Sequence, residues 1–139
     1  MIKKLFYLEP HYGARAYTKK SKLVKAIANS KHRKNLEDFK YVVSRMEKGL
    51  PKKGIDCLTS VPRRDSSTNY SLKLAKALSK TSGIPYQSPK KASGRVLIID
   101  DVIETGKTVD KVARKLNSAK EVSVFTATKG LYFQKKRGK

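Results

Sequence analysis

The chain has 139 residues and carries 33 Lys and Arg against 11 Asp and Glu, a formal net charge of +22, so its surface attracts polyanions such as phosphorylated metabolites or nucleic acid. This length suits a single domain spanning 1–139 that buries its own core, and the one cysteine, Cys57, excludes an internal disulfide and a cysteine cluster for a metal. No stretch approaches the roughly 20 apolar residues of a membrane span, and the apolar run at the N-terminus is too short for a signal sequence, so we expect a cytoplasmic protein without a membrane partner.

The first part of the chain predicts one short strand and two helices. The apolar run Leu5–Leu8 is either an edge strand or a piece of the core. Helices are expected over Lys22–Asn29 and Leu36–Met46, and in the second the apolar residues recur at three- and four-residue spacing, which marks one helical face. Asn35 suits the N-cap of the second helix, and Gly49 suits its end.

Strands and helices alternate from residue 55 onward. The expected elements are a strand Ile55–Val61, a helix Ser71–Leu78, a short strand Ile84–Tyr86, a strand Val96–Ile99, a helix Thr108–Leu116 and a strand Glu121–Ala127. The four consecutive aliphatic residues of Val96–Ile99 are typical of a central parallel strand covered on both faces. The alternation predicts an α/β fold, an open and mainly parallel sheet with flanking helices. In such sheets ligands bind outside the carboxyl ends of the strands.

The most informative segment follows Val96–Ile99, where the chain continues Asp100-Asp101-Val102-Ile103-Glu104-Thr105-Gly106-Lys107-Thr108. Gly106 permits a tight turn and the close approach of a ligand to the backbone. The amides from Thr105 to Thr108 lie at the expected start of a helix, where unpaired N–H groups and the helix dipole favour a phosphate. Asp100 and Asp101 would repel a phosphate, so they suit the hydroxyls of a sugar or a bound divalent cation.

Two other interpretations of this segment are weaker. The triplet Gly106-Lys107-Thr108 matches the end of a Walker-A loop of nucleotide hydrolases and kinases, but that motif needs a glycine five residues before Gly106, where Asp101 stands. An ordinary strand–turn–helix connection with acidic capping is the second alternative. Two adjacent aspartates followed by Thr-Gly-Lys-Thr are too particular a pattern for it.

The segment Asp100–Thr108 resembles the signature with which type I phosphoribosyltransferases bind 5-phosphoribosyl 1-pyrophosphate (PRPP). The resemblance implies the fold of that family and the transfer of a phosphoribosyl group to a nitrogen acceptor such as a nucleobase, with release of pyrophosphate. It implies that Asp100 and Asp101 hold the ribose hydroxyls. The residues implied around the 5′-phosphate are Glu104, Thr105, Gly106, Lys107 and Thr108. Mg²⁺ is the implied cofactor, bound through PRPP, and the two aspartates are candidate ligands for it.

A basic loop after the expected strand Ile55–Val61 supports the resemblance. Family members bind pyrophosphate in a loop at this place, and Arg63 and Arg64 supply the bidentate donors that pyrophosphate requires. A solvated basic turn is the alternative. The arrangement of Pro62, Arg63 and Arg64 before Asn69 and a helix rich in Leu and Ala is most similar to competence protein F (ComF)-like phosphoribosyltransferases. The long flexible loop of many family members is short or missing.

Candidate residues for binding the nucleobase come from a second resemblance within the same family. Hypoxanthine-guanine phosphoribosyltransferases resemble the motif and carry an acidic residue at the position of Glu104, which takes a proton from the purine. By the same resemblance, Lys129 would contact a carbonyl of the base, and Tyr132 or Phe133 would stack on it. The alternatives are surface roles for Glu104 and Lys129 and core positions for the two aromatic residues.

The role of the N-terminal part stays open. Residues 55–128 form the expected core, and residues 1–50 are a hood over the site, a dimer arm or a basic arm for nucleic acid. The rival to an enzyme is a non-catalytic protein that senses PRPP or nucleotides or binds nucleic acid through its basic surface, as the ComF-like resemblance allows. A homodimer is a further expectation from the family.

Overall fold

The structure, a computed structural model, describes residues 2–11, 21–62, 69–103 and 106–130. Its elements are β1 (Ile2–His11), α1 (Lys22–His32), α2 (Leu36–Gly49), β2 (Cys57–Ser60), α3 (Tyr70–Ser82), β3 (Gly94–Ile103), α4 (Lys107–Lys115) and β4 (Ala119–Gly130). None of the helices in this described part has the length and apolar character needed to cross a bilayer.

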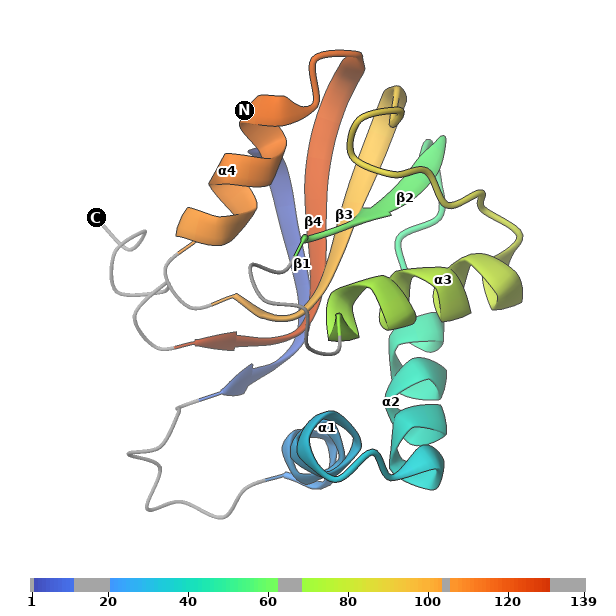
Figure 1. Ribbon diagram of the computed structural model, residues 1–139, viewed down its shortest axis with the longest axis vertical. Coiled ribbons are helices and arrows are strands. Elements are labelled where there is room, and N and C mark those ends of the chain that lie inside the picture. Colours follow the sequence, from blue (N-terminus) through green and yellow to red (C-terminus); the bar gives the residue numbers. More distant parts are fainter. Residues whose placement is uncertain (1, 12–20, 63–68, 104–105, 131–139) are drawn as a thin grey trace.

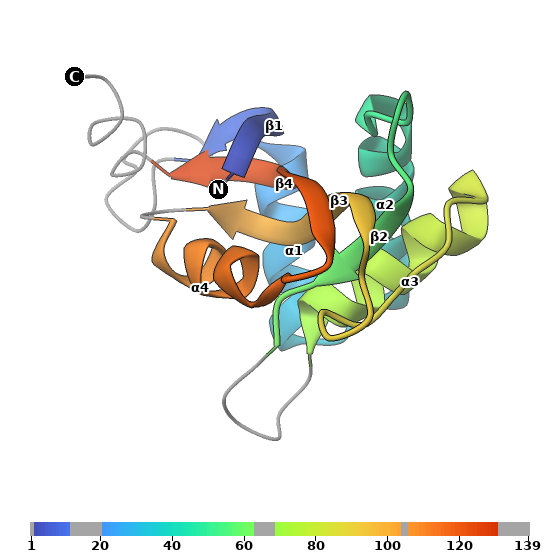
Figure 2. The same ribbon diagram turned by 90° about the horizontal axis from the view of Figure 1, so that it is seen from above.

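Four parallel strands form one open sheet in the order β1-β4-β3-β2. Figure 2 shows them side by side in this order. Helices cover both faces of the sheet, with α4 on one side and α2 and α3 on the other (Figure 1). The predicted α/β class with an open parallel sheet is therefore confirmed, and β1 is an edge strand that pairs with β4 over nearly its whole length.

The residues of β3 show why the sheet is covered twice. Leu97 and Ile99 pack into a core cluster with α1, α2 and α3, whereas Val96 and Ile98 pack into a second cluster with α4. All four side chains are at most 1% exposed. Successive side chains of a strand point to opposite faces, so a run of four aliphatic residues supplies apolar surface to both helical layers.

The chain changes direction across the sheet at β2. After β2 and α3, Tyr86 forms a single parallel bridge to Leu58 on the outer side of β2, with the Leu58 amide donating to the Pro85 carbonyl at 2.9 Å. The chain then crosses back to form β3 on the inner side. Because parallel crossovers are right-handed, this reversal places α3 and α4 on opposite faces. The carboxyl ends of β2 and β3 flank the switch point, where open α/β sheets bind ligands.

Two predicted strands differ in length from the structure, each because of its pairing, and one predicted helix cap is confirmed. The short strand expected over Ile84–Tyr86 is reduced to the one bridge. The strand β3 is longer than predicted, because it pairs with β4 as far as Ile103, so Asp100 and Asp101 belong to the strand itself. Asn35 caps α2 as predicted, since its side chain accepts the Asp38 amide at 3.0 Å.

Candidate functional site

A pocket of about 330 Å³ opens at the carboxyl ends of β2 and β3, at the switch point of the sheet. We call it the carboxylate pocket. Its lining residues are Lys31, Val61, Pro62, Tyr70, Ser71, Asp100, Asp101, Val102 and Thr108. They come from α1, α3, β3, α4 and the segment after β2, so the pocket exists only because the fold brings distant parts of the chain together.

Two adjacent carboxylates form the acidic wall of this pocket. Asp101 is buried, and Asp100 is partly exposed. The Asp101 amide donates to Asp100 Oδ1 at 2.9 Å, which fixes the orientation of the Asp100 carboxyl. Lys31 Nζ lies 2.9 Å from Asp101 Oδ2. Because Lys31 is in the last turn of α1, this ion pair ties α1 to the carboxyl edge of the sheet, beside which α1 lies in Figure 1.

The pKa values of the two carboxyls shift in opposite directions. Burial, and then the negative charge of Asp101, raise the pKa of Asp100 well above its ordinary value. Burial also opposes the ionisation of Asp101, but the hydrogen bond with Asp100 and the charge of Lys31 outweigh it and lower the pKa of Asp101. Asp101 is therefore the ionised member of the pair, and Asp100 is the member that takes up a proton first. Such a pair can both accept and donate hydrogen bonds to neighbouring hydroxyls.

Ser71 holds the two sides of the carboxylate pocket together. Its Oγ accepts the amide of Val61 at 2.8 Å and donates to the carbonyl of Ile99 at 2.6 Å. The side chain is buried, and it stands in the first turn of α3. One hydroxyl thus links the segment after β2 and the start of α3 to Ile99 of β3, where the pairing of β2 with β3 ends.

A second pocket, of about 230 Å³, lies at the start of α4, and we call it the helix-start pocket. Its lining residues are Asp100, Val102, Ile103, Gly106, Lys107, Thr108 and Val109. Side chains cap the other three helices, whereas the N-cap of α4 is Gly106, which has no side chain and a φ of 87°. The first amides of α4 therefore have no N-cap side chain of their own, as suits a bound anion.

The two pockets adjoin, because Asp100, Val102 and Thr108 line both. Together they present carboxyl groups at one end and a helix N-terminus at the other. Sugar hydroxyls suit the first end and a phosphate the second.

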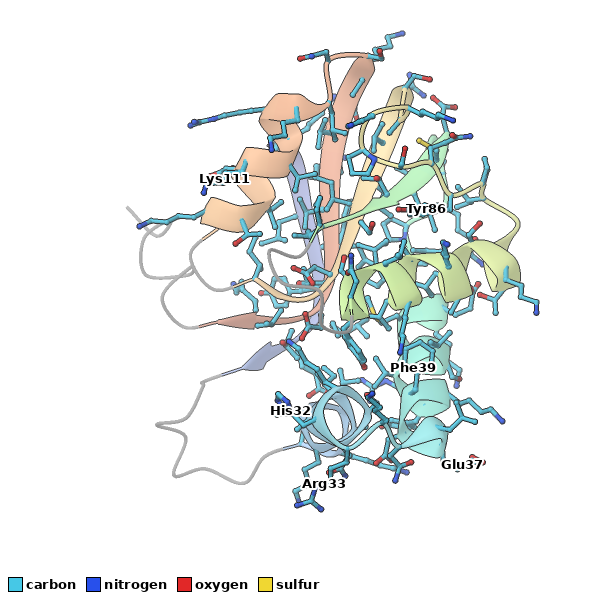
Figure 3. All side chains as sticks on the ribbon, in the orientation of Figure 1. His32, Arg33, Glu37, Phe39, Tyr86 and Lys111 are labelled. Carbon is cyan, nitrogen blue, oxygen red and sulfur yellow. The ribbon has the colours of Figure 1, made fainter. Side chains whose placement is uncertain are left out.

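A third pocket, of about 180 Å³, lies between α1 and the sheet, and we call it the α1 pocket. Its lining residues are Val24, Ile27, Ala28, Lys31, His32, Asp101, Val102 and Thr128. It adjoins the carboxylate pocket, because Lys31, Asp101 and Val102 line both. Figure 3 shows His32 on α1.

The structure gathers part of the predicted site. Asp100, Asp101, Gly106, Lys107 and Thr108 line the two adjoining pockets. Lys129 lies within β4 and lines none of them; its Nζ is 3.1 Å from Tyr7 Oη and 4.3 Å from the centre of that ring. Six predicted site residues lie outside the described ranges: Arg63, Arg64, Glu104, Thr105, Tyr132 and Phe133.

Sequence reasoning missed Lys31, Tyr70 and Ser71. Lys31 is one of many lysines in a basic segment, so nothing in its sequence context distinguishes it. Tyr70 and Ser71 could have been found, because the first turn of a helix that follows a strand and its loop lies at the carboxyl edge of a parallel sheet.

The donor set for a metal is small. Among the described residues no group of three or more His, Cys, Asp or Glu side chains could hold a cation. Asp100 and Asp101 are two carboxylates, and Lys31 already engages one oxygen of Asp101. Mg²⁺ readily keeps waters and shares one or two carboxylates with the oxygens of a phosphorylated ligand, so these residues fit Mg²⁺ only together with such a ligand.

Comparison with known proteins bears on the fold. No protein-family model and no curated protein matches the sequence. Among solved structures, UMP synthase of Leishmania donovani is similar with a TM-score of 0.51 and 22% identity, over 73% of this chain and 30% of that one. The chain therefore shares the α/β fold of part of UMP synthase. An adenine phosphoribosyltransferase superposes with a TM-score of 0.48 and 16% identity, over 76% and 77% of the two chains. This chain spans less than a third of the UMP synthase chain, and at such identities the likeness concerns the fold alone.

Proposed function

We propose that the protein binds PRPP and transfers its phosphoribosyl group to a nitrogen acceptor. One observation carries the proposal: the carboxylate and helix-start pockets adjoin at the switch point and share Asp100 and Thr108. A ribose 5-phosphate has hydroxyls at one end and a phosphate at the other, and the two pockets offer matching groups in the same order. The resemblance of Asp100–Thr108 to the PRPP-binding signature of type I phosphoribosyltransferases, and a fold similar to part of UMP synthase, support the same ligand.

Each protein group has a distinct part in the proposed reaction. Asp100 and Asp101 orient the ribose hydroxyls, and Thr108 with the first amides of α4 holds the 5′-phosphate. Arg63 and Arg64 follow Val61 and Pro62, which line the carboxylate pocket, so we assign the pyrophosphate to them.

In the transfer step, the bond from ribose C1 to the pyrophosphate oxygen breaks, and pyrophosphate leaves with the electron pair. The acceptor nitrogen forms the new bond to C1 and gives its proton to a base, for which we propose Glu104. When bound with PRPP, Mg²⁺ would neutralise charge on the leaving pyrophosphate.

The acceptor site is proposed at the α1 pocket, which adjoins the carboxylate pocket at Lys31 and Asp101. This gives α1 the role of a hood. Thr128 lines that pocket, and since successive side chains of a strand point to opposite faces, Lys129 points away from it toward Tyr7. A contact of Lys129 with the base would require it to leave Tyr7. Tyr132 and Phe133 stay proposals for stacking on the base.

Isothermal titration with PRPP, with and without Mg²⁺, tests the proposal. We expect one-to-one binding that strengthens with Mg²⁺ and disappears in the double variant Asp100→Asn with Asp101→Asn. The control is Glu37→Gln with Asp38→Asn in the first turn of α2, which changes the net charge equally and should leave binding intact. Unchanged binding in the Asp100 and Asp101 double variant would remove the proposed site.

A second candidate function is a non-catalytic sensor of PRPP or nucleotides, or a nucleic-acid-binding protein, of the ComF-like type. The short connection of residues 87–93 between the Tyr86 bridge and β3 favours this second function. A transferase must exclude water from the reactive sugar, and a short loop closes poorly over the reacting centre. In that case PRPP would bind, and no base in a screen of acceptors would release pyrophosphate. Binding of an oligonucleotide that survives near physiological salt would point to nucleic acid.

A further inference from the structure

A separate pocket of about 440 Å³ lies where the turn between α1 and α2 meets α3. Its interior is formed by Leu36, Phe39 and Tyr70, and lysines surround it, so we call it the lysine-rimmed pocket. Among the described lining residues, only Tyr70 is shared with the carboxylate pocket, and none is shared with the helix-start or α1 pockets. The volume is in the range of small-molecule sites.

The interior is apolar and already ordered. Phe39 and Tyr70 pack edge to face, with ring centres 5.8 Å apart and planes at 80°. Tyr70 is held further by a 2.6 Å hydrogen bond between its hydroxyl and Ser30 Oγ. Leu36 is 65% exposed, and with Tyr7 it is one of two large apolar side chains that stay exposed in the described part of the chain. An apolar group bound here would cover Leu36 without rearranging the two rings.

The rim carries positive charge. Lys34, Lys73 and Lys76 line the pocket, and none of them forms an ion pair with a described carboxylate. Lys76 has a competing contact, because its Nζ lies 5.8 Å from the centre of the Tyr86 ring. Asn35 and Leu36 also line the pocket, but the Asn35 side chain caps α2, so the positive charge of the site comes from the lysines.

Acidic residues stand nearby but outside the pocket. Glu37 and Asp38 are in the first turn of α2, and neither lines the pocket. Figure 3 shows Phe39 between α2 and α3 and Glu37 at the outer end of α2. The pocket therefore combines an apolar floor with a positive rim.

The end of α1 sets the position of Lys34. Lys34 has a φ of 55°, and it is the one described residue other than glycine with a positive φ. Glycine adopts this left-handed conformation without a steric penalty, whereas a residue with a side chain is strained there. Lys34 directly follows Arg33, the C-cap of α1, where helices commonly end on a left-handed residue, so the end of α1 explains this conformation and places the lysine at the rim of the pocket.

We propose that the lysine-rimmed pocket binds a small organic anion with an apolar body, an aromatic or long-chain carboxylate, sulfonate or phosphate. The apolar body lies on Leu36, Phe39 and Tyr70, and the acid group meets Lys34 and Lys73. This site is distinct from the proposed phosphoribosyl site and does not depend on it.

The test uses the aromatic sulfonate 8-anilinonaphthalene-1-sulfonate and the full chain, with fluorescence and calorimetric titration. We expect one-to-one binding with enhanced fluorescence. The variants Leu36→Asn and Lys73→Glu with Lys76→Glu should each weaken it, the second by about tenfold, since the favourable contact at Lys73 becomes repulsive and a second positive charge of the rim, at Lys76, is reversed. Both changes are at exposed positions, and circular dichroism checks that the fold is kept.

The matched control is Lys90→Glu with Lys91→Glu, an equal change of charge at exposed positions in the connection before β3. It should leave binding within about twofold, as expected for a remote charge screened by salt. An equal loss in this control would show that the general charge attracts the probe, and binding that survives both pocket variants would place it elsewhere. Either result, or no binding at all, overturns the proposal. PRPP affinity of Lys73→Glu with Lys76→Glu should equal that of the Lys90→Glu with Lys91→Glu control, which separates this site from the phosphoribosyl site.

Discussion

Asp100 and Asp101 are neighbours in sequence, yet their surroundings give them opposite tendencies to ionise. The side chain of Asp101 forms an ion pair with Lys31, whereas Asp100 is desolvated by its surroundings and lies beside the negative charge of Asp101. In the proposed function this asymmetry matters, because a carboxyl that holds a proton can donate a hydrogen bond to a ribose hydroxyl, whereas an ionised carboxyl can only accept one.

The raised pKa of Asp100 makes a prediction for stability. Between about pH 4, where the unfolded carboxyl titrates, and the raised pKa of the folded state, the folded protein binds more protons than the unfolded chain. The free energy of unfolding contributed by Asp100 therefore falls as the pH rises through this window. Asp100→Asn removes the effect while its Oδ1 still accepts the Asp101 amide.

We expect the variant Asp100→Asn to exceed the wild-type protein in stability at pH 7 and the difference to shrink toward pH 4. Urea denaturation at a series of pH values, without divalent cations, measures it. The control is Asp110→Asn on α4, the same change of side chain at a residue that lines none of the pockets described above, measured over the same pH series. A constant difference for Asp100→Asn across the range would contradict the assigned ionisation.

At the residue scale, the sequence predicts the site residues that lie close together in the chain and misses those that distant segments bring together. Asp100, Asp101 and Gly106 were predictable, because one strand, one turn and one helix start place them within a few residues of each other. Lys31 was not, since its partner Asp101 is 70 positions away and the pair forms only when α1 lies beside the sheet edge. The lysine-rimmed pocket was hidden for the same reason: its walls come from α1, α2 and α3.

At the scale of elements, α3 acts as a brace between β2 and β3. The hydroxyl of Ser71 is the acceptor for the buried Val61 amide and a donor to the Ile99 carbonyl. Ser71→Ala leaves both backbone groups without these partners, and an unsatisfied buried group costs about 1–3 kcal/mol. We expect the variant to lose about that much stability.

PRPP binding should weaken with it, because Ser71 sets the spacing between the segment after β2 and the carboxylates of β3. Chemical denaturation and calorimetric titration measure the two effects. Ser79→Ala on the same helix is the control, since the Ser79 side chain makes no hydrogen bond to a described residue and alanine favours a helix. If Ser71→Ala behaved like Ser79→Ala in both measurements, α3 would not brace the site.

The elements themselves were largely predictable, but their order in the sheet was not. Apolar periodicity gave α2, α3 and the strand β3, because each pattern is local. The order β1-β4-β3-β2 depends on the pairing of Tyr86 outside β2 and of β1 with β4, contacts between residues far apart in the sequence. The switch point, and with it the location of the site, follows from that order.

At the scale of the whole molecule, the net charge of +22 on 139 residues dominates the surface. Like charges that are close together in the folded state repel each other, and unfolding relieves the repulsion by spreading them apart. The charge also draws anions toward both proposed sites. Affinity for phosphorylated ligands therefore has a general, salt-dependent part and a specific part, which the matched-charge controls separate.

The self-repulsion predicts that salt stabilises this protein. Raising the NaCl concentration from about 0.01 M to about 0.2 M shortens the screening length from about 30 Å to below 10 Å, so repulsion across the molecule is largely removed. We expect the melting temperature to rise by several degrees, since each kcal/mol of stability shifts it by roughly 4 °C for a domain of this size. Scanning calorimetry over the salt series measures how steeply the melting temperature rises with salt.

The variant Lys90→Glu with Lys91→Glu lowers the net charge and should make this rise less steep, because fewer like charges remain to be screened. A melting temperature that is independent of salt in the wild-type protein would mean that the positive charges are already far enough apart, or balanced locally, and that the net charge does not act on the fold.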